Sequence, residues 1–130
     1  MTTLLDEDEP TWFPDPINFD DDGLVAVSEK LGIERLIEAY QRGIFPWMKM
    51  DFGPHFWCWF SPNPRMVLLP EKLKISNSLN RVIQKKKFEI KVDHGFPETM
   101  RACASVERPK QEATWIEEDM IRDYTELHSL

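Results

Sequence analysis

The residues best suited to bind a ligand are aromatic side chains that cluster near the middle of the chain. The 130 residues include five tryptophans, and three of these, Trp47, Trp57 and Trp59, fall within thirteen positions. Exposed indoles stack on nucleic-acid bases, and each stack contributes about 1–3 kcal/mol. Prolines at 46, 54, 62 and 64 exclude a regular helix, so the rings are expected on loops or strand edges. The alternative is that the rings form the core, because aromatic side chains are the largest apolar groups that a small domain can bury.

A second candidate is a group of cations on one expected helix that Ser76 is suited to cap. The inward positions of this helix are apolar: Leu79, Val82 and Ile83. The outer face carries the cations: Arg81, Lys85, Lys86 and Lys87. Cations on one helix face bind a phosphate backbone without reading its sequence. The alternative is a solvated face whose cations favour the helix dipole.

The net charge of −7 hides an uneven distribution along the chain. Residues 1–22 hold eight of the 23 acidic residues and no Lys or Arg, so residues 23–130 hold 15 acids against 16 bases. Within residues 72–91, seven bases accompany a single acid. A local excess of positive charge in an acidic chain favours a polyanionic partner for the expected basic helix.

Metal and covalent chemistry have little support in the sequence. The three histidines and Cys58 do not provide the three or four suitably spaced ligands of a zinc site. Cys103 with His94 is a weak thiol–base pair, because a small buried cysteine on a helix usually serves packing. The five glycines form no phosphate-binding loop. Since there is no C-x-x-C motif, signal peptide or apolar run of about 20 residues, we expect a reduced, cytoplasmic protein.

Hydropathy patterns predict the elements that position these residues. Short strands are expected at residues 24–27, 66–70 and 88–92. Helices are expected from Ile33 to a capping Gly43, after Ser76, from Pro97 to about Cys103, and from Ile116 onward. The acidic segment 1–22 contains three prolines and is expected to be an extended lead-in, which Trp12, Phe13 and Phe19 could hold in place.

Several strings occur in the order seen in one family. They include Ala39–Trp47 (AYQRGIFPW), Trp59–Arg65 (WFSPNPR) and Thr114–Ile116 (TWI). The sequence resembles the bacterial leucyl/phenylalanyl-tRNA–protein transferases over about residues 13–130, and the first of these strings is highly specific. The resemblance implies an enzyme that moves leucine or phenylalanine from aminoacyl-tRNA to the N-terminal Arg or Lys of an acceptor protein, which marks that protein for degradation in the N-degron pathway.

The resemblance also implies an α+β fold in three parts. After the lead-in of residues 1–22, residues 23–65 would form a small N-terminal α/β domain. Residues 66–130 would begin an acetyltransferase-like (GNAT-type) catalytic domain that is truncated here. No metal or cofactor is expected, because an aminoacyl ester is already activated and its aminolysis needs positioning and proton transfer.

Site residues carry over from the family by matching motifs. Tyr40, Trp47 and Trp115 are expected to hold the 3′-terminal aminoacyl-adenosine, with the two indoles on either side of the adenine. The basic cluster is expected to grip the tRNA body: Arg81, Lys85, Lys86 and Lys87. The family's catalytic proton relay lies beyond Leu130 and has no counterpart in this sequence.

The sequence departs from the family pattern in three places. The loop from Met48 to Phe56 is longer than expected, and Phe60 stands where a second tryptophan is common. The final helix lacks a capping glycine, a proline or a basic last turn, and together with the missing relay this suggests the N-terminal part of a longer transferase. The alternative is a non-catalytic fragment that binds tRNA or aminoacyl-adenosine.

Overall fold

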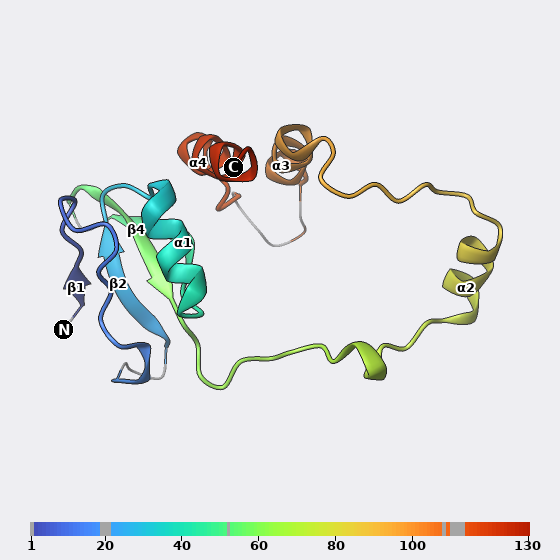
Figure 1. The fold of residues 1–130 in the computed structure, drawn as a ribbon, viewed down its shortest axis with the longest axis horizontal. Helices are drawn as coiled ribbons and strands as arrows, with labels where there is room; N and C mark the ends of the chain where they lie inside the picture. The colour runs from blue at the N-terminus through green and yellow to red at the C-terminus, as the bar shows by residue number, and fades with distance from the viewer. Residues whose placement is uncertain (1, 19–21, 52, 108, 110–113) are drawn as a thin grey trace. The chain divides into compact units, whose positions relative to one another are not determined.

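The computed structural model describes residues 2–18, 22–51, 53–107, 109 and 114–130 (Figure 1). The chain divides into two compact units, one of residues 1–63 with 95–130 and one of residues 64–94. Within the described ranges the fold is a small mixed α/β structure, with four α-helices and one four-stranded sheet. The predicted mixture of helices and strands is therefore confirmed.

The sheet belongs to the first unit and has the strand order β1-β2-β4-β3. Its strands are β1 (Thr3–Leu4), β2 (Leu24–Ser28), β3 (Phe45–Asp51) and β4 (His55–Phe60). The short β1 runs parallel to β2, whereas β2 with β4 and β3 with β4 are antiparallel. The strand expected at residues 24–27 is confirmed, and the long segment after Trp47 forms the β3–β4 hairpin.

The acidic N-terminal segment is built into the sheet and its surroundings. Next to β1, the amide of the buried Leu5 donates to the carbonyl of Val27 over 2.8 Å. Glu7 Oε1 lies 3.0 Å from Nη1 of Arg35, a buried cation that also donates to the carbonyls of Asp6 and Lys30. Since a buried cation needs a paired charge and several acceptors, this part of the lead-in stabilises α1, which carries Arg35.

The aromatic residues of the lead-in differ in their environments. Phe13 is buried and meets Trp59 edge to face, with 5.1 Å between ring centroids, so it does fix the segment as expected. Trp12 is half exposed. Phe19 lies outside the described residues.

Three helices complete the first unit: α1 (Ile33–Gln41), α3 (Phe96–Ser105) and α4 (Glu118–His128). All three predicted helices are confirmed; Gly43 follows α1 with a φ of +71°, and Pro97 lies in the first turn of α3. Helix α4 packs against both α1 and α3 (Figure 1). The core joins the sheet to α1 and α4 through buried apolar residues that include Val25, Leu36, Ala39, Trp57, Trp59, Met120 and Ile121. Most of the predicted loop around Arg108 and Lys110 lies outside the described residues.

The second unit contains a 3₁₀ turn, Pro70–Lys72, and one helix, α2 (Asn77–Gln84). The predicted cap is confirmed, because Ser76 Oγ accepts a hydrogen bond from the amide of Leu79 over 3.2 Å. The inward orientation expected for Leu79 and Ile83 is wrong, since both side chains are about half exposed. Within the described part of this unit no side chain is fully buried, so α2 has no core to face.

The two strands predicted for the second unit are wrong. Residues 66–69 and 88–92 form no strand, and their apolar side chains are exposed, to 98% for Met66 and 90% for Ile90. A strand exists only where a neighbouring strand accepts its backbone hydrogen bonds. Alternating hydropathy reports a side chain's preference for burial, but it does not report whether a partner strand is present.

Two glycines with positive φ provide a matched test of close packing in the first unit. A Cβ added to Gly23 (φ +75°) would lie 2.7 Å from Cα of Pro62, whereas one added to Gly32 (φ +69°) meets no atom within 4 Å. We expect Gly32→Ala to cost about 1–3 kcal/mol of unfolding free energy, because its φ of 69° with a ψ of 143° is a backbone conformation almost restricted to glycine. Gly23→Ala should cost about 1–3 kcal/mol more, because Pro62 must move. Denaturant unfolding of both variants measures the difference, and equal losses would contradict the close approach.

Candidate functional site

The three clustered tryptophans have two different roles. Trp57 and Trp59, on β4, are fully buried, so core packing is the correct interpretation for this pair. The indole N–H of Trp59 donates to Ser28 Oγ over 2.8 Å, and that hydroxyl donates to the carbonyl of Lys30. Trp47 differs, because its side chain is 42% exposed.

Trp47 is displayed from an edge strand, as the prolines of this segment predicted. It lies on β3 at the point where the register with β4 shifts between Pro46 and Met48. Such a bulge turns a side chain out of the regular alternation. The indole rests edge-on against Phe60, with 5.2 Å between centroids, and lies 6.4 Å from the ring of Phe45. The indole therefore has two ring neighbours, while part of it stays open to solvent.

Tyr40 is 50% exposed on α1, and its hydroxyl lies 2.6 Å from the hydroxyl of Tyr124 on α4. The two rings are perpendicular. Burial raises the pKa of Tyr124, and the hydrogen bond with Tyr40 raises it further, so Tyr124 stays protonated and can donate to Tyr40.

Sequence reasoning missed the contact of Tyr124 with Tyr40, because the spacing of Tyr124 matched the apolar side of the last helix. A signal was present nonetheless. A buried phenol usually needs a hydrogen-bond partner, and the chain has only one other tyrosine.

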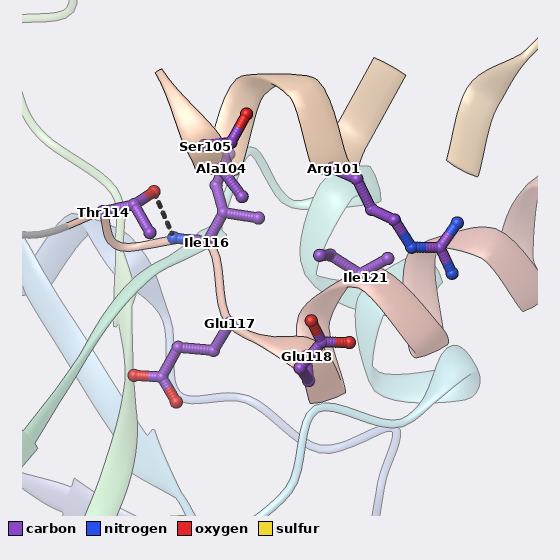
Figure 2. A pocket seen from close by; sticks show the side chains of 8 residues that line it. All are labelled: Arg101, Ala104, Ser105, Thr114, Ile116, Glu117, Glu118 and Ile121. Carbon is purple, nitrogen blue, oxygen red and sulfur yellow. Dashed lines mark hydrogen bonds between the residues drawn. The ribbon is translucent and has the colours of Figure 1, made fainter. Parts of the chain in front are cut away.

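Trp115 is 37% exposed and lies in the short segment that leads into α4. Its neighbours are fixed, since Ile116 is buried and its amide donates to Thr114 Oγ1 over 3.2 Å (Figure 2). This segment borders an open pocket of about 650 Å³ between α3 and α4. The pocket is lined by Arg101, Ala104, Ser105, Thr114, Ile116, Glu117, Glu118 and Ile121.

The three residues expected to hold the adenosine are all in the first unit, but their rings do not touch one another. Among the described residues, the ring partner of Tyr40 is Tyr124, and the ring partners of Trp47 are Phe45 and Phe60. The four expected tRNA-binding cations are in the second unit, on α2 or directly after it, and all are exposed: Arg81, Lys85, Lys86 and Lys87.

A polar cluster between β3 and the start of α4 is a feature that the sequence patterns do not reveal. Lys49 Nζ lies 2.7 Å from Asp119 Oδ2 and 2.9 Å from Glu117 Oε2, and 4.9 Å from the ring centroid of Trp57. The buried indole N–H of Trp57 donates to Asp119 Oδ2 over 3.0 Å. In the sequence, acids at this helix start are explained well enough by the helix dipole, and their partner Lys49 is about 70 positions earlier.

The charges of this cluster stabilise one another. Burial acts to raise the pKa of Asp119, but hydrogen bonds from Lys49, Trp57 and the amide of Met120 outweigh it and leave the pKa lowered. Burial likewise acts to lower the pKa of Lys49, and its bonds to Asp119 and Glu117 leave that pKa raised. Both shifts favour the charged forms that the ion pairs require.

The cysteines and histidines form no comparable cluster. Among the described residues, no three His, Cys, Asp or Glu side chains are placed to hold a metal ion. Cys58 is buried, and burial raises the pKa of its thiol. Cys103 is exposed on α3, so the expected core packing of this side chain is wrong. No helix in the described ranges is long and apolar enough to cross a membrane.

Comparison with known proteins gives a consistent match along most of the chain. Residues 29–63 match the model of the leucyl/phenylalanyl-tRNA protein transferase N-terminal domain, and residues 67–130 match the model of leucyl/phenylalanyl-tRNA protein transferase. Proteins named leucyl/phenylalanyl-tRNA–protein transferase are similar in sequence. The one from Dechloromonas aromatica is 46% identical over 108 residues, which is 83% of this chain and 45% of the relative. The one from Nitrosomonas eutropha is 48% identical over 106 residues, 82% of this chain and 44% of the relative.

Two consecutive matches define the class, a transferase family whose members carry a separate N-terminal domain. The chain belongs to the leucyl/phenylalanyl-tRNA protein transferase family. A further relative, from Anaeromyxobacter sp. strain Fw109-5, is 45% identical over 91% of this chain and 49% of its own length. The chain thus spans about half the length of the curated relatives that it matches.

The polar cluster predicts a pH-dependent contribution to stability. Because the folded-state pKa of Asp119 is lowered below its ordinary value of 3.8, the carboxylate stabilises the fold fully above that value. The contribution is lost as the pH falls through the folded-state pKa. We expect Asp119→Asn to cost about 1–3 kcal/mol of unfolding free energy at neutral pH and progressively less in acid.

Urea unfolding followed by tryptophan fluorescence across this pH range measures the loss. Glu118→Gln, at the exposed neighbour in the same helical turn, serves as the control and should change stability by no more than about 0.5 kcal/mol. A penalty for Asp119→Asn that stayed constant into acid would contradict the assigned ionisation.

Proposed function

We propose that this chain acts in transferring leucine or phenylalanine from aminoacyl-tRNA to the N-terminal Arg or Lys of acceptor proteins in the cytoplasm, which marks them for degradation. The observation that carries the proposal is the pair of family matches, which together cover residues 29–63 and 67–130. The names of the curated relatives specify a leucyl/phenylalanyl-tRNA–protein transferase.

The exposed aromatic side chains of the first unit suit the 3′ end of the tRNA. Trp47 and Trp115 would stack on the terminal adenine, and Tyr40 would lie beside the aminoacyl-adenosine. The partial exposure of all three rings supports these roles, because a stacking platform needs an open face. The hydrogen bond between the Tyr40 and Tyr124 hydroxyls supports them further, since it orients the Tyr40 hydroxyl before a ligand arrives.

The chemistry of this step suits a site without metal or cofactor. An aminoacyl ester is already activated, so the attacking amine must lose a proton and the departing ribose oxygen must gain one. Positioning of the two substrates supplies much of the remaining acceleration. The groups that move these protons are expected outside this sequence.

The cations of α2 and its end suit the tRNA body, and their exposure leaves them accessible to phosphates: Arg81, Lys85, Lys86 and Lys87. Residues 72–91 contain seven bases and one acid, so the net charge of this segment is positive, whereas that of the whole chain is negative. Such a surface attracts an RNA backbone through counterion release rather than through base recognition.

The second unit suits the start of an incomplete acetyltransferase-like domain. The family matches break between residues 63 and 67, which supports a domain boundary near residues 65 and 66. Exposed apolar side chains at residues 66–69 and 88–92 are those expected of strands that lack their neighbours. The unmatched half of the relatives is long enough to supply such neighbours and the catalytic relay.

Transfer of labelled leucine from leucyl-tRNA to a peptide with N-terminal arginine tests the function. The second candidate is a fragment that binds tRNA without transferring its amino acid. It is favoured because the chain matches 44–49% of the length of these relatives. Binding with transfer supports the enzyme, and binding without transfer supports the fragment. If the chain neither binds tRNA nor transfers leucine, both candidates are refuted.

Replacement of Trp47 tests the stacking role. We expect Trp47→Ala to weaken binding of a non-hydrolysable aminoacyl-adenosine by about 1–3 kcal/mol, because one stacking surface is removed. Trp12→Ala is a matched control, since Trp12 has a similar exposed fraction and no assigned role. Isothermal titration calorimetry measures both affinities, and an unchanged affinity in a folded Trp47→Ala variant would exclude the indole from the site.

Salt dependence tests the basic cluster. Replacing Lys85, Lys86 and Lys87 with alanine should reduce the slope of log affinity for tRNA against log salt by up to about 3, or about 0.9 for each phosphate that a lysine no longer neutralises. Lys30→Ala provides the control for a lysine outside the cluster and should leave the slope unchanged. A slope that the triple replacement does not alter would remove these lysines from the interface.

A further inference from the structure

The polar cluster joins the chain segments that carry two of the exposed indoles, Trp47 and Trp115. Lys49 is two positions after Trp47 on β3, and Glu117 is two positions after Trp115. The 2.9 Å ion pair between Lys49 and Glu117 therefore links the two segments at the same sequence distance from their tryptophans. In Figure 2, the Glu117 carboxylate is turned away from the other labelled side chains, in keeping with this contact to the sheet.

Asp119 makes the link rigid. Its carboxylate accepts hydrogen bonds from Lys49 Nζ over 2.7 Å, from the buried Trp57 indole over 3.0 Å and from the amide of Met120 over 3.0 Å. Trp57 is the cross-strand partner of Lys49 and has no exposed surface. The lysine is thus held between a ring of the core and the first turn of α4. The Lys49–Asp119 pair is largely buried and is less weakened by solvent than the pair with Glu117, whose side chain is exposed.

We propose that the cluster of Lys49, Glu117 and Asp119 is a positioning device that holds the strand of Trp47 and the segment of Trp115 at a fixed separation, so that both indoles are set for a planar base before it binds. The proposal rests on the proposed function for the identity of that base. Lys49 lies in the segment from Met48 to Phe56, which is longer than the family pattern predicts. The proposal therefore assigns this lengthened segment a structural function.

Preorganisation is the physical reason that such a link would matter. Ile116 and Met120 already anchor the segment of Trp115 to the core, and the cluster adds a direct link from that segment to β3. Any motion between the two segments that this link removes in the free protein need not be restricted when a ligand binds. A link made in the free protein removes this cost from the binding step. The expected consequence is a change in ligand affinity that is separable from any change in stability.

The test combines a ligand with a direct probe of the indoles. The full chain is labelled with 5-fluorotryptophan, and its five ¹⁹F resonances are assigned by single Trp→Phe replacements. The ligand is 3′-phenylalanylamino-3′-deoxyadenosine, in which an amide replaces the ester. We expect Lys49→Met to weaken its binding about fivefold or more and to shift or broaden the Trp115 resonance, with Trp59 unchanged.

Two further variants separate positioning from stability. Lys49→Arg keeps the charge and should restore affinity to within about twofold of the original. Glu38→Gln breaks a 2.6 Å ion pair between α1 and Arg42, the residue directly after it, and should alter neither readout, because this pair joins no distant segments. If Lys49→Met does not fold, Glu117→Gln removes one ion pair and leaves the Asp119–Trp57 hydrogen bond in place.

The outcomes distinguish this proposal from the proposed function. If Lys49→Met leaves both the affinity and the Trp115 resonance unchanged, the positioning role is overturned. The same holds if Glu38→Gln changes the affinity and the Trp115 resonance as much as Lys49→Met does. If the unsubstituted chain fails to bind the ligand, the proposed function is refuted. The Trp115 resonance in Lys49→Met then still decides whether the cluster holds that segment.

Discussion

The first unit depends on the burial of two indoles whose N–H groups must each find an acceptor. Trp59 reaches Ser28 on the neighbouring strand, whereas Trp57 reaches Asp119 at the start of α4. A buried N–H without a partner costs about 1–3 kcal/mol, so the second bond requires α4 to begin beside β4. A carboxylate in that place requires a cation in turn, and Lys49 supplies it. One buried N–H thereby determines a chain of contacts from the sheet to the last helix.

The second unit shows what happens to an apolar pattern that has nothing to pack against. Helix α2 forms with the expected cap, because capping and local spacing suffice for a short helix. Residues 66–69 and 88–92 have the composition of strands but form none, because a strand needs hydrogen bonds from a neighbour. The exposed side chains of these two segments therefore have no strand partner within the described residues, in a chain that spans about half the length of the curated relatives that it matches.

The aromatic segment divides between buried and exposed rings according to strand position. Strand β4 lies between two neighbours in the sheet, and its indoles are covered on both sides. Strand β3 is at the edge, where Pro46 costs no ladder bond and a bulge turns Trp47 toward solvent. Residues of one type within thirteen positions thus serve the core or the surface according to the strand that carries them.

The sequence alone determined the helices, the capping roles of Ser76 and Gly43, the strand at residues 24–27 and the family, because each depends on residues close together in the chain or on a contiguous string. It also predicted that the basic residues after Ser76 would be exposed, but the expected helix face is wrong for three of them: α2 ends at Gln84, so it carries Arg81, and Lys85, Lys86 and Lys87 follow its last residue. Only the tertiary structure decided which indoles are buried, and only it paired Tyr40 with Tyr124 and Lys49 with Asp119. Those partners are 84 and 70 positions apart in the sequence, and hydropathy spacing carries no information about contacts at such separations. The buried polar groups made these pairings necessary, and the packing of the sheet against α1 and α4 determined which partners met.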